Sequence, residues 1–170
     1  METIKLLIGN GDRRTSAIIE SLVRDVCRDH AVVVCQRTSC VDELICSACT
    51  EDFALIIFSP DNLVARPNAI TSTLSHLSQG IRASRAIKSH TRAHLIAVAA
   101  SPEWEEPLLE AGADSVLSLP FNCERLKSVV QSALAAQPKR EAPEVQIQAS
   151  AFGQLLSRVY QRLAHVTGLV

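Results

Sequence analysis

Three groups of residues in this 170-residue sequence have types and spacing that could do chemistry. The first is a glycine-containing loop from Gly9 to Ser16, which follows an apolar run and precedes a helical pattern. The second is a pair of thiols, Cys46 and Cys49, and the third is a basic stretch from Arg82 to His94. They suggest, respectively, phosphate binding, thiol redox or metal chemistry, and docking of an acidic partner.

A loop between a strand and a helix can hold a phosphate group with its backbone N–H groups. The Gly9–Ser16 loop, however, matches neither the G-x-G-x-x-G pattern nor the Walker pattern. Nucleotide or flavin binding is therefore the weaker interpretation, and we expect no cofactor. The alternative function that stays open is a small-molecule or redox sensor that uses this loop or the cysteines.

The cysteines indicate reduced thiols, because a chain of this size without a secretory signal needs no disulfides. Cys46 and Cys49 share one helix face but lie towards the end of the predicted helix, where the dipole does not lower a thiol pKa. No second pair completes a zinc site, so we expect no metal and interpret them as small buried apolar residues. The full set is Cys27, Cys35, Cys40, Cys46, Cys49 and Cys123.

The basic stretch is interpreted as a solvated helix face, with a docking surface for an acidic partner as the alternative. No aromatic residue alternates with its cations to stack on bases, and the net charge of the chain is −1. We therefore expect no direct contact with nucleic acid. The residues are Arg82, Arg85, Lys88, His90, Arg92 and His94.

Apolar runs alternate with helical patterns along the chain. The order of strands and helices predicts a doubly wound, five-stranded parallel sheet with helices on both faces. Aromatic residues make up only 4% of the chain, which favours the aliphatic core of such a sheet. Ser39 and Asn122 are predicted helix caps, and Gly112 a left-handed helix stop. The predicted strands are Ile4–Ile8, Ala31–Cys35, Phe53–Phe58, Leu95–Ala100 and Ser115–Leu119.

Two segments interrupt this order. The first is a predicted insertion at about 61–79 after the third strand, with a helix at 70–77 and a break at Gly80 before the basic helix. The second follows the domain predicted at 1–136: a linker at 137–149 and a C-terminal amphipathic helix at 150–170.

The apolar stripe of the C-terminal helix has coiled-coil spacing and predicts a homodimer to which this helix contributes. The stripe is Phe152, Leu156, Val159, Leu163 and Val166.

No apolar run is long enough to span a bilayer, and the N-terminus lacks the order of a signal peptide. We therefore expect a cytoplasmic protein with no membrane partner.

Residues 109–121, LEAGADSVLSLPF, resemble the LEAGAD-x-x-L-x-K-P-F stretch of two-component response-regulator receiver domains, the CheY-like family. The predicted order of strands and helices from residue 3 to 136 fits the same family. The resemblance implies a receiver (flavodoxin-like) fold. It also implies a role in bacterial phosphorelay signal transduction through contacts with other signalling proteins, which the sequence does not identify.

The resemblance also implies a phosphorylation site with four elements. A working receiver has an acidic pair after strand one, an acceptor Asp ending strand three, a Thr or Ser ending strand four, and a Lys before the strand-five Pro. In this sequence these positions fall on Asn10 and Gly11, with Asp12 beside them, and on Phe58, Ser101 and Leu119.

These departures predict a degenerate receiver that is neither phosphorylated nor an enzyme. Phe58 offers no oxygen nucleophile, and Leu119 cannot pair with a phosphoryl group. Asn10 and Asp12 supply few of the oxygen ligands that Mg²⁺ requires. We expect Phe58 and Leu119 to pack as apolar fill in the former pocket. Asp61, three residues past Phe58, could in principle accept a phosphoryl group, but no lysine or acidic pair would support it.

Overall fold

The structure is a computed structural model, and it describes residues 2–63, 76–120 and 122–136. The chain divides into two units, Met1–Pro138 and Lys139–Val170, and the described residues all belong to the first. The predicted C-terminal helix, its apolar stripe and most of the predicted helix at 70–77 lie outside the described residues. Within the described ranges, no helix combines the length and apolar character that crossing a membrane requires.

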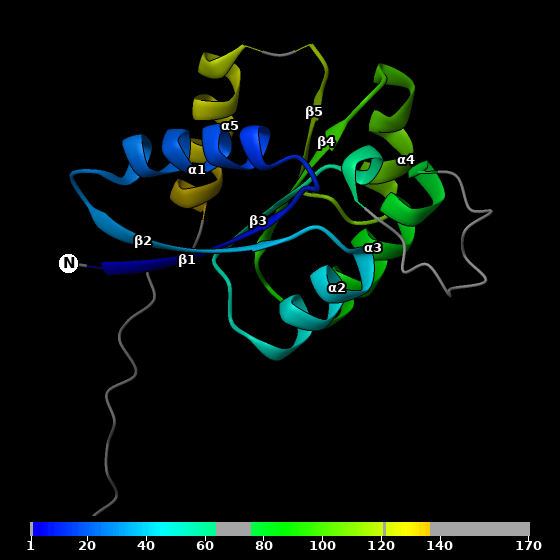
Figure 1. Cartoon of the computed structure of the whole chain (residues 1–170), viewed down its shortest axis with the longest axis horizontal. Helices are drawn as coiled ribbons and strands as arrows, with labels where there is room; N and C mark the ends of the chain where they lie inside the picture. The colour runs from blue at the N-terminus through cyan, green and yellow to red at the C-terminus, as the bar shows by residue number, and fades with distance from the viewer. Residues whose placement is uncertain (1, 64–75, 121, 137–170) are drawn as a thin grey trace, which may run out of the picture. The chain divides into compact units, whose positions relative to one another are not determined.

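A single parallel sheet forms the centre of the first unit, as predicted. Its strands are ordered β2-β1-β3-β4-β5, so the chain reverses its winding direction between β1 and β3 (Figure 1). Each strand differs from its predicted range by no more than a few residues. The bounds are β1 (Glu2–Gly9), β2 (Ala31–Thr38), β3 (Leu55–Phe58), β4 (His94–Ala99) and β5 (Ser115–Ser118).

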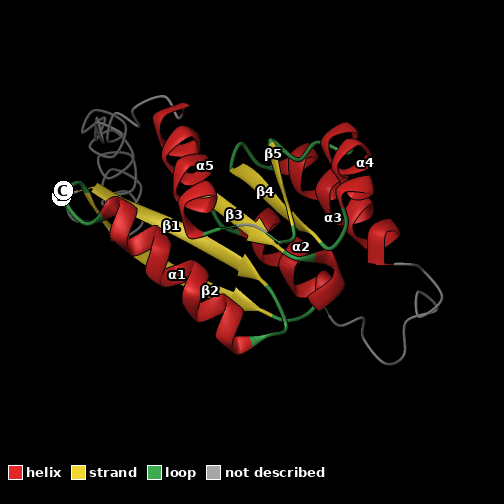
Figure 2. Ribbon diagram, turned by 90° about the horizontal axis from the view of Figure 1, so that it is seen from above, coloured by secondary structure: helices red, strands yellow, loops and turns green. Residues whose placement is uncertain are grey.

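Helices cover both faces of the sheet (Figure 2). α1 (Arg13–Cys27) and α5 (Cys123–Ala136) pack on one face, and α2 (Val41–Thr50), α3 (His76–His90) and α4 (Glu105–Glu110) pack on the other. Two short 3-10 helices, η1 (Pro60–Asn62) and η3 (Pro102–Trp104), follow β3 and β4. Both therefore lie at the carboxyl edge of the sheet, where ligands of open α/β sheets usually bind.

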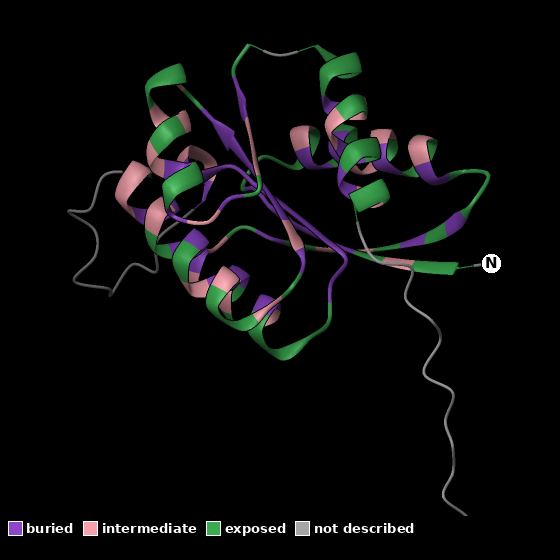
Figure 3. Ribbon diagram, turned by 180° about the vertical axis from the view of Figure 1, so that it is seen from behind, coloured by how far each residue is buried: buried purple, intermediate pink, exposed green. Residues whose placement is uncertain are grey.

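Alternating side chains of the strands form two aliphatic cores. In β3, Leu55 and Ile57 pack towards α1 and α5, whereas Ile56 and Phe58 pack towards α2 and α3. All four side chains are fully buried, and β4 is buried at every residue after its first (Figure 3). Such continuous apolar strands are typical of a parallel sheet covered on both faces.

Gly80 does not break the helix predicted on either side of it; that prediction was wrong. α3 runs without interruption from His76 to His90. A Cβ atom at Gly80 would lie 2.7 Å from Cγ of Pro60 and 3.1 Å from Cδ2 of Leu108. Glycine is needed here because η1 and α4 approach the backbone of α3 closely, and not because the helix ends.

The three predicted helix-end signals have different outcomes. Asn122 accepts a hydrogen bond from the Arg125 N–H at 2.8 Å, and Gly112 has a φ of 106°, so both predictions are confirmed. Ser39 does not cap α2, because the N-cap position is one residue later, at Cys40. The side chain that supports this turn is Thr38, whose hydroxyl accepts from the Cys40 N–H at 3.3 Å.

The close approach at Gly80 predicts that Gly80→Ala destabilises the fold. Alanine favours a helix over glycine by about 1 kcal/mol, but overpacking a core typically costs about 1–3 kcal/mol. Thermal unfolding should show a lower midpoint for this variant. Ser89→Ala, at an exposed position of the same helix, is the control and should unfold at or above the wild-type temperature. A Gly80→Ala variant that is more stable than the wild type would contradict the close approach.

Candidate functional site

The carboxyl edge of β1 and β3 brings together residues that the sequence analysis placed at one site. Gly9 pairs with Phe58 in the sheet, so the residues that follow, Asn10 and Ser59, lie side by side. The Asn10 side-chain amide donates to Oγ of Ser59 at 3.1 Å, and Asn10 is only 5% exposed. Ser59 directly follows β3, so strand register could have identified it, but the sequence analysis did not.

The loop after β1 is closed by hydrogen bonds within the protein. Oδ1 of Asn10 accepts the Asp12 N–H at 2.8 Å, and the Gly11 N–H donates to the Asn62 carbonyl in η1 at 2.7 Å. The Asn10 N–H donates to the Thr38 carbonyl at 2.9 Å. These N–H groups are therefore already occupied and are not available to bind a phosphate.

Asp12 serves as the N-cap of α1. Its carboxylate accepts the backbone N–H groups of Arg14 and Thr15 at 3.1 and 3.2 Å, and also the Thr15 hydroxyl. The Thr15 hydroxyl and these N–H groups hold the pKa of Asp12 below its usual value. Both oxygens are used in capping, so Asp12 is a structural residue in this geometry and a poor substitute for an acidic metal-binding pair.

Phe58, which the sequence analysis assigned to the acceptor position, is fully buried. It ends β3 between Gly9 of β1 and Ala97 of β4, and its side chain packs in the core beneath α2 and α3. Phe58 therefore packs against apolar residues, as the sequence analysis expected.

Leu119 is not buried fill, and that prediction was wrong. It is 41% exposed. It lies one residue beyond β5, the outermost strand on that side of the sheet, so no neighbouring strand covers it.

Ser101 and Asp61, the other two predicted positions, follow the ends of β4 and β3. β4 ends at the buried Ala99, so Ser101 lies two residues beyond the strand end; its hydroxyl accepts the Glu103 N–H and caps η3. Asp61 lies in η1, where its Oδ1 is buried without a hydrogen-bond partner among the described residues. Besides Ser59, the sequence analysis missed a second hydroxyl at this edge, that of Ser118, which donates to the Glu105 carboxylate.

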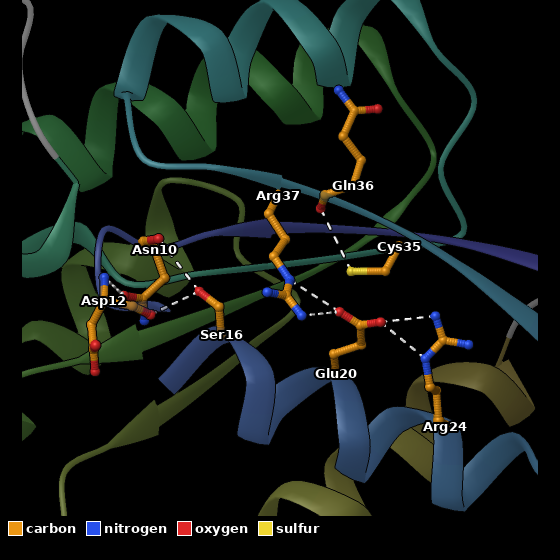
Figure 4. Close-up of polar contacts among 8 residues, drawn as sticks. All are labelled: Asn10, Asp12, Ser16, Glu20, Arg24, Cys35, Gln36 and Arg37. Atoms are coloured by element: carbon orange, nitrogen blue, oxygen red, sulfur yellow. Dashed lines mark hydrogen bonds and ion pairs between the residues drawn. The ribbon is translucent and has the colours of Figure 1, made fainter. Parts of the chain in front are cut away.

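A shallow pocket of about 370 Å³ lies beside the loop, between the ends of β1 and β2. Arg13 and Arg37 give it a positive character, but Arg37 donates through Nε to Glu20 at 3.0 Å (Figure 4). Since the neighbouring backbone N–H groups are also occupied, the geometry offers little support for the nucleotide-binding alternative. The lining residues are Asn10, Gly11, Arg13, Ser16, Arg37, Thr38 and Ser39.

Glu20 is the centre of a charged network that joins α1 to β2 (Figure 4). Its carboxylate accepts from Arg37 and, at 2.8 Å, from Arg24. The hydrogen bonds from Arg37 lower the pKa of Glu20 to about 2. Nearby, burial and the negative charge of Glu20 raise the pKa of the Cys35 thiol to about 11. No sequence motif links residues 20 and 37, so this network was not foreseen.

Cys46 and Cys49 are exposed, so their interpretation as small buried apolar residues was wrong. Among the other thiols, Cys27 is buried, Cys35 and Cys40 are half-buried, and Cys123 is exposed. No group of three or more metal-ligating side chains occurs among residues 2–63, 76–120 and 122–136.

The basic stretch does not form one cationic surface. Arg82 pairs with Asp42 of α2 at 2.9 Å, and Lys88 pairs with Asp114 at 2.8 Å. His94 lies in β4, where burial lowers its pKa. Ion pairing with neighbouring elements therefore reduces the positive charge that the sequence pattern suggested.

Comparison with solved structures identifies the fold. The receiver domain of a Pseudomonas aeruginosa sensor histidine kinase, solved with a magnesium ion in its active-site cleft, matches 79% of this chain and 99% of its own, with 18% identity and a TM-score of 0.58. A CheY-like receiver domain protein from Methanospirillum hungatei matches 80% of this chain and 100% of its own, with 18% identity and a TM-score of 0.51.

A structure described as a CpaE2 pilus assembly protein from Sinorhizobium meliloti also matches. It covers 76% of this chain and 99% of its own, with 11% identity and a TM-score of 0.57. In sequence, no family model and no curated protein matches the chain. The structural matches show that the chain has the fold of response-regulator receiver domains, as the sequence analysis predicted.

The Glu20 network predicts a specific dependence of stability on pH. The pKa of Glu20 in the folded state is about 2, below its ordinary value of 4.5, so its contribution is present above about pH 4.5 and is lost as the pH falls towards 2. Glu20→Gln should lower the free energy of unfolding at pH 7 by ~1–2 kcal/mol and flatten this acid dependence. Urea unfolding at several pH values measures both effects.

Glu124→Gln is the matched control, because the Glu124 side chain is 80% exposed. It should leave both the stability and its acid dependence unchanged. An equal response of the two variants would show that the network contributes nothing beyond an ordinary surface carboxylate.

Proposed function

We propose that this chain is an atypical receiver domain of bacterial two-component signal transduction that acts through protein–protein contacts and is not itself phosphorylated. The receiver fold supports the signalling class. The single observation that supports the absence of phosphorylation is Phe58, a fully buried aromatic residue at the end of β3. The expected partners are other signalling proteins, and a cytoplasmic location stays a prediction.

The surrounding residues support the same proposal. Aspartyl phosphorylation requires a carboxylate nucleophile beside a bound Mg²⁺, which prefers several oxygen ligands. The Asp12 carboxylate is committed to capping α1, and the Asn10 side chain is committed to Ser59 and to the Asp12 N–H. Since no phosphoryl group would be chemically attached, signals would be transmitted by which surfaces the domain presents to its partners.

Incubation of the full chain with acetyl phosphate and Mg²⁺ tests this proposal. We expect its intact mass to stay unchanged while a working receiver domain, treated in parallel, gains a phosphoryl group. Affinity capture from the native host should at the same time recover signalling proteins.

A phosphoryl adduct that disappears in Asp61→Asn would contradict the proposal, because it would identify Asp61 as an acceptor. An adduct that persists in this variant would contradict it equally, since another side chain would then accept the group.

We also propose a homodimer to which the C-terminal stripe of Phe152, Leu156, Val159, Leu163 and Val166 contributes. A stripe of this spacing is stabilised by apolar contact with a partner helix. Light scattering of the double variant Leu156→Asp, Leu163→Asp should give a monomer mass where the wild type gives a dimer.

The matched control is Gln154→Asp, Gln161→Asp, which adds the same charge outside the stripe and should remain dimeric. Dimers of both variants, or a monomeric wild type, would contradict the role of the stripe.

A further inference from the structure

Cys46 and Cys49 are separated from the other thiols by their exposure and by their position on one helix. Burial raises the pKa of the Cys27 thiol, and burial with the charge of Glu20 raises that of Cys35, so both stay protonated near neutral pH. The thiolate is the form that reacts, so burial makes these two thiols less reactive than thiols that face solvent. The exposed thiols are Cys46, Cys49 and Cys123.

Among the exposed thiols, α2 holds two and α5 holds one. Cys123 begins α5, which packs on the opposite face of the sheet from α2, so it cannot meet Cys46 or Cys49 within one chain. The half-buried Cys40 is the N-cap of α2, six residues and ~9 Å of helix rise before Cys46. The pair that can meet is therefore Cys46 and Cys49.

Helix geometry places the Cβ atoms of Cys46 and Cys49 close to the separation that a disulfide needs. Residues three apart on a helix have Cβ atoms about 5–6 Å apart, and a disulfide needs about 3.5–4.5 Å. The remaining difference is small, and it falls in the final turn of α2, which ends at Thr50. A helix end can tighten or fray more easily than a helix centre, so closing the bond requires only a local change.

The final turn of α2 is connected to two strands. Oγ of Ser47 accepts from Nε2 of Gln36 in β2 at 3.0 Å, and the Glu51 carboxylate pairs with Lys5 in β1 at 3.6 Å. Within the turn, the Thr50 hydroxyl donates to the Cys46 carbonyl at 2.9 Å. A disulfide that tightens this turn would thus alter contacts with β1 and β2 as well as the surface of α2.

We propose that Cys46 and Cys49 form a redox-active dithiol, which a small-molecule disulfide such as oxidised glutathione closes into a disulfide within α2. The proposal is independent of the receiver function, because neither thiol belongs to the site at the carboxyl edge. It assigns a covalent modification to the exposed surface of α2, away from the carboxyl edge at which receiver domains are phosphorylated.

The reaction proceeds by two exchanges. One thiol loses its proton to water, and the thiolate attacks a sulfur of oxidised glutathione, so that a mixed disulfide forms and one glutathione thiolate leaves. The second thiol loses its proton in turn and attacks the protein sulfur of the mixed disulfide, releasing the second glutathione thiolate. The two leaving thiolates take up the two protons, so one oxidised glutathione is reduced and one protein dithiol is oxidised.

The full chain is incubated with oxidised glutathione, alkylated, and analysed by intact mass and by cleavage after glutamate. Cleavage at Glu43 and Glu51 releases residues 44–51, which contain Cys46 and Cys49 but no other cysteine. We expect this peptide to lose two hydrogen atoms, to resist alkylation, and to recover both thiols after treatment with dithiothreitol.

Single variants separate ring closure from ordinary reactivity of exposed thiols. Cys46→Ser and Cys49→Ser should each accumulate a mixed disulfide with glutathione at the remaining thiol, because the second exchange is blocked. Cys123→Ser is the matched control and should still form the bridge. Glutathione on both residues of the wild type, a bridge to Cys40, or full alkylation of the peptide would each overturn the proposal.

Discussion

The packing of Phe58 between β1 and β4 determines what the carboxyl edge of this sheet can do. The parallel register sets Gly9 and Ala97 on either side of Phe58, and its ring fills the core beneath α2 and α3. The resemblance to receiver domains assigns the oxygen nucleophile of that family to this position. A charged carboxylate moved into these apolar surroundings would lose its hydration without a compensating partner, which is costly. An aromatic residue here therefore stabilises the fold and offers no oxygen nucleophile.

Near Phe58, the polar groups of Asn10, Gly11 and Asp12 are hydrogen-bonded within the protein. Oδ1 of Asp61, in η1, is buried without a hydrogen-bond partner among the described residues. Asn10 is paired with Ser59, Asp12 caps α1, and the Gly11 N–H is bonded to η1. Each of these groups would have to give up an existing hydrogen bond to hold an ion or a phosphate. Since buried polar groups are expensive to leave unpaired, the arrangement favours one fixed conformation of the β1 loop. Function is then expected at the outer surfaces of this unit, which include the exposed thiols of α2.

The sequence predicted the fold well because apolar periodicity reports on burial. Five strands, their order in the chain and the caps at Gly112 and Asn122 follow from local residue types. Apart from the predicted cap at Ser39, which is displaced by one residue, the errors concern contacts between distant segments and exposure. Gly80 is a helix breaker by local propensity, yet Pro60 and Leu108 make glycine the residue that fits inside α3. Leu119 is apolar, but its position beyond an edge strand leaves it exposed. Sequence spacing likewise could not show that Glu20 pairs with Arg37, or that Cys46 and Cys49 face solvent.

A Mg²⁺ titration of the full chain, followed by NMR of its backbone amides, measures directly whether the carboxyl edge holds a divalent ion. If Phe58 and its hydrogen-bonded neighbours have closed this edge, Asn10, Gly11 and Ser59 should show no saturable shift. A saturable shift centred on these residues, with the stoichiometry of a single site, would mean that the edge still binds the ion on which receiver chemistry depends.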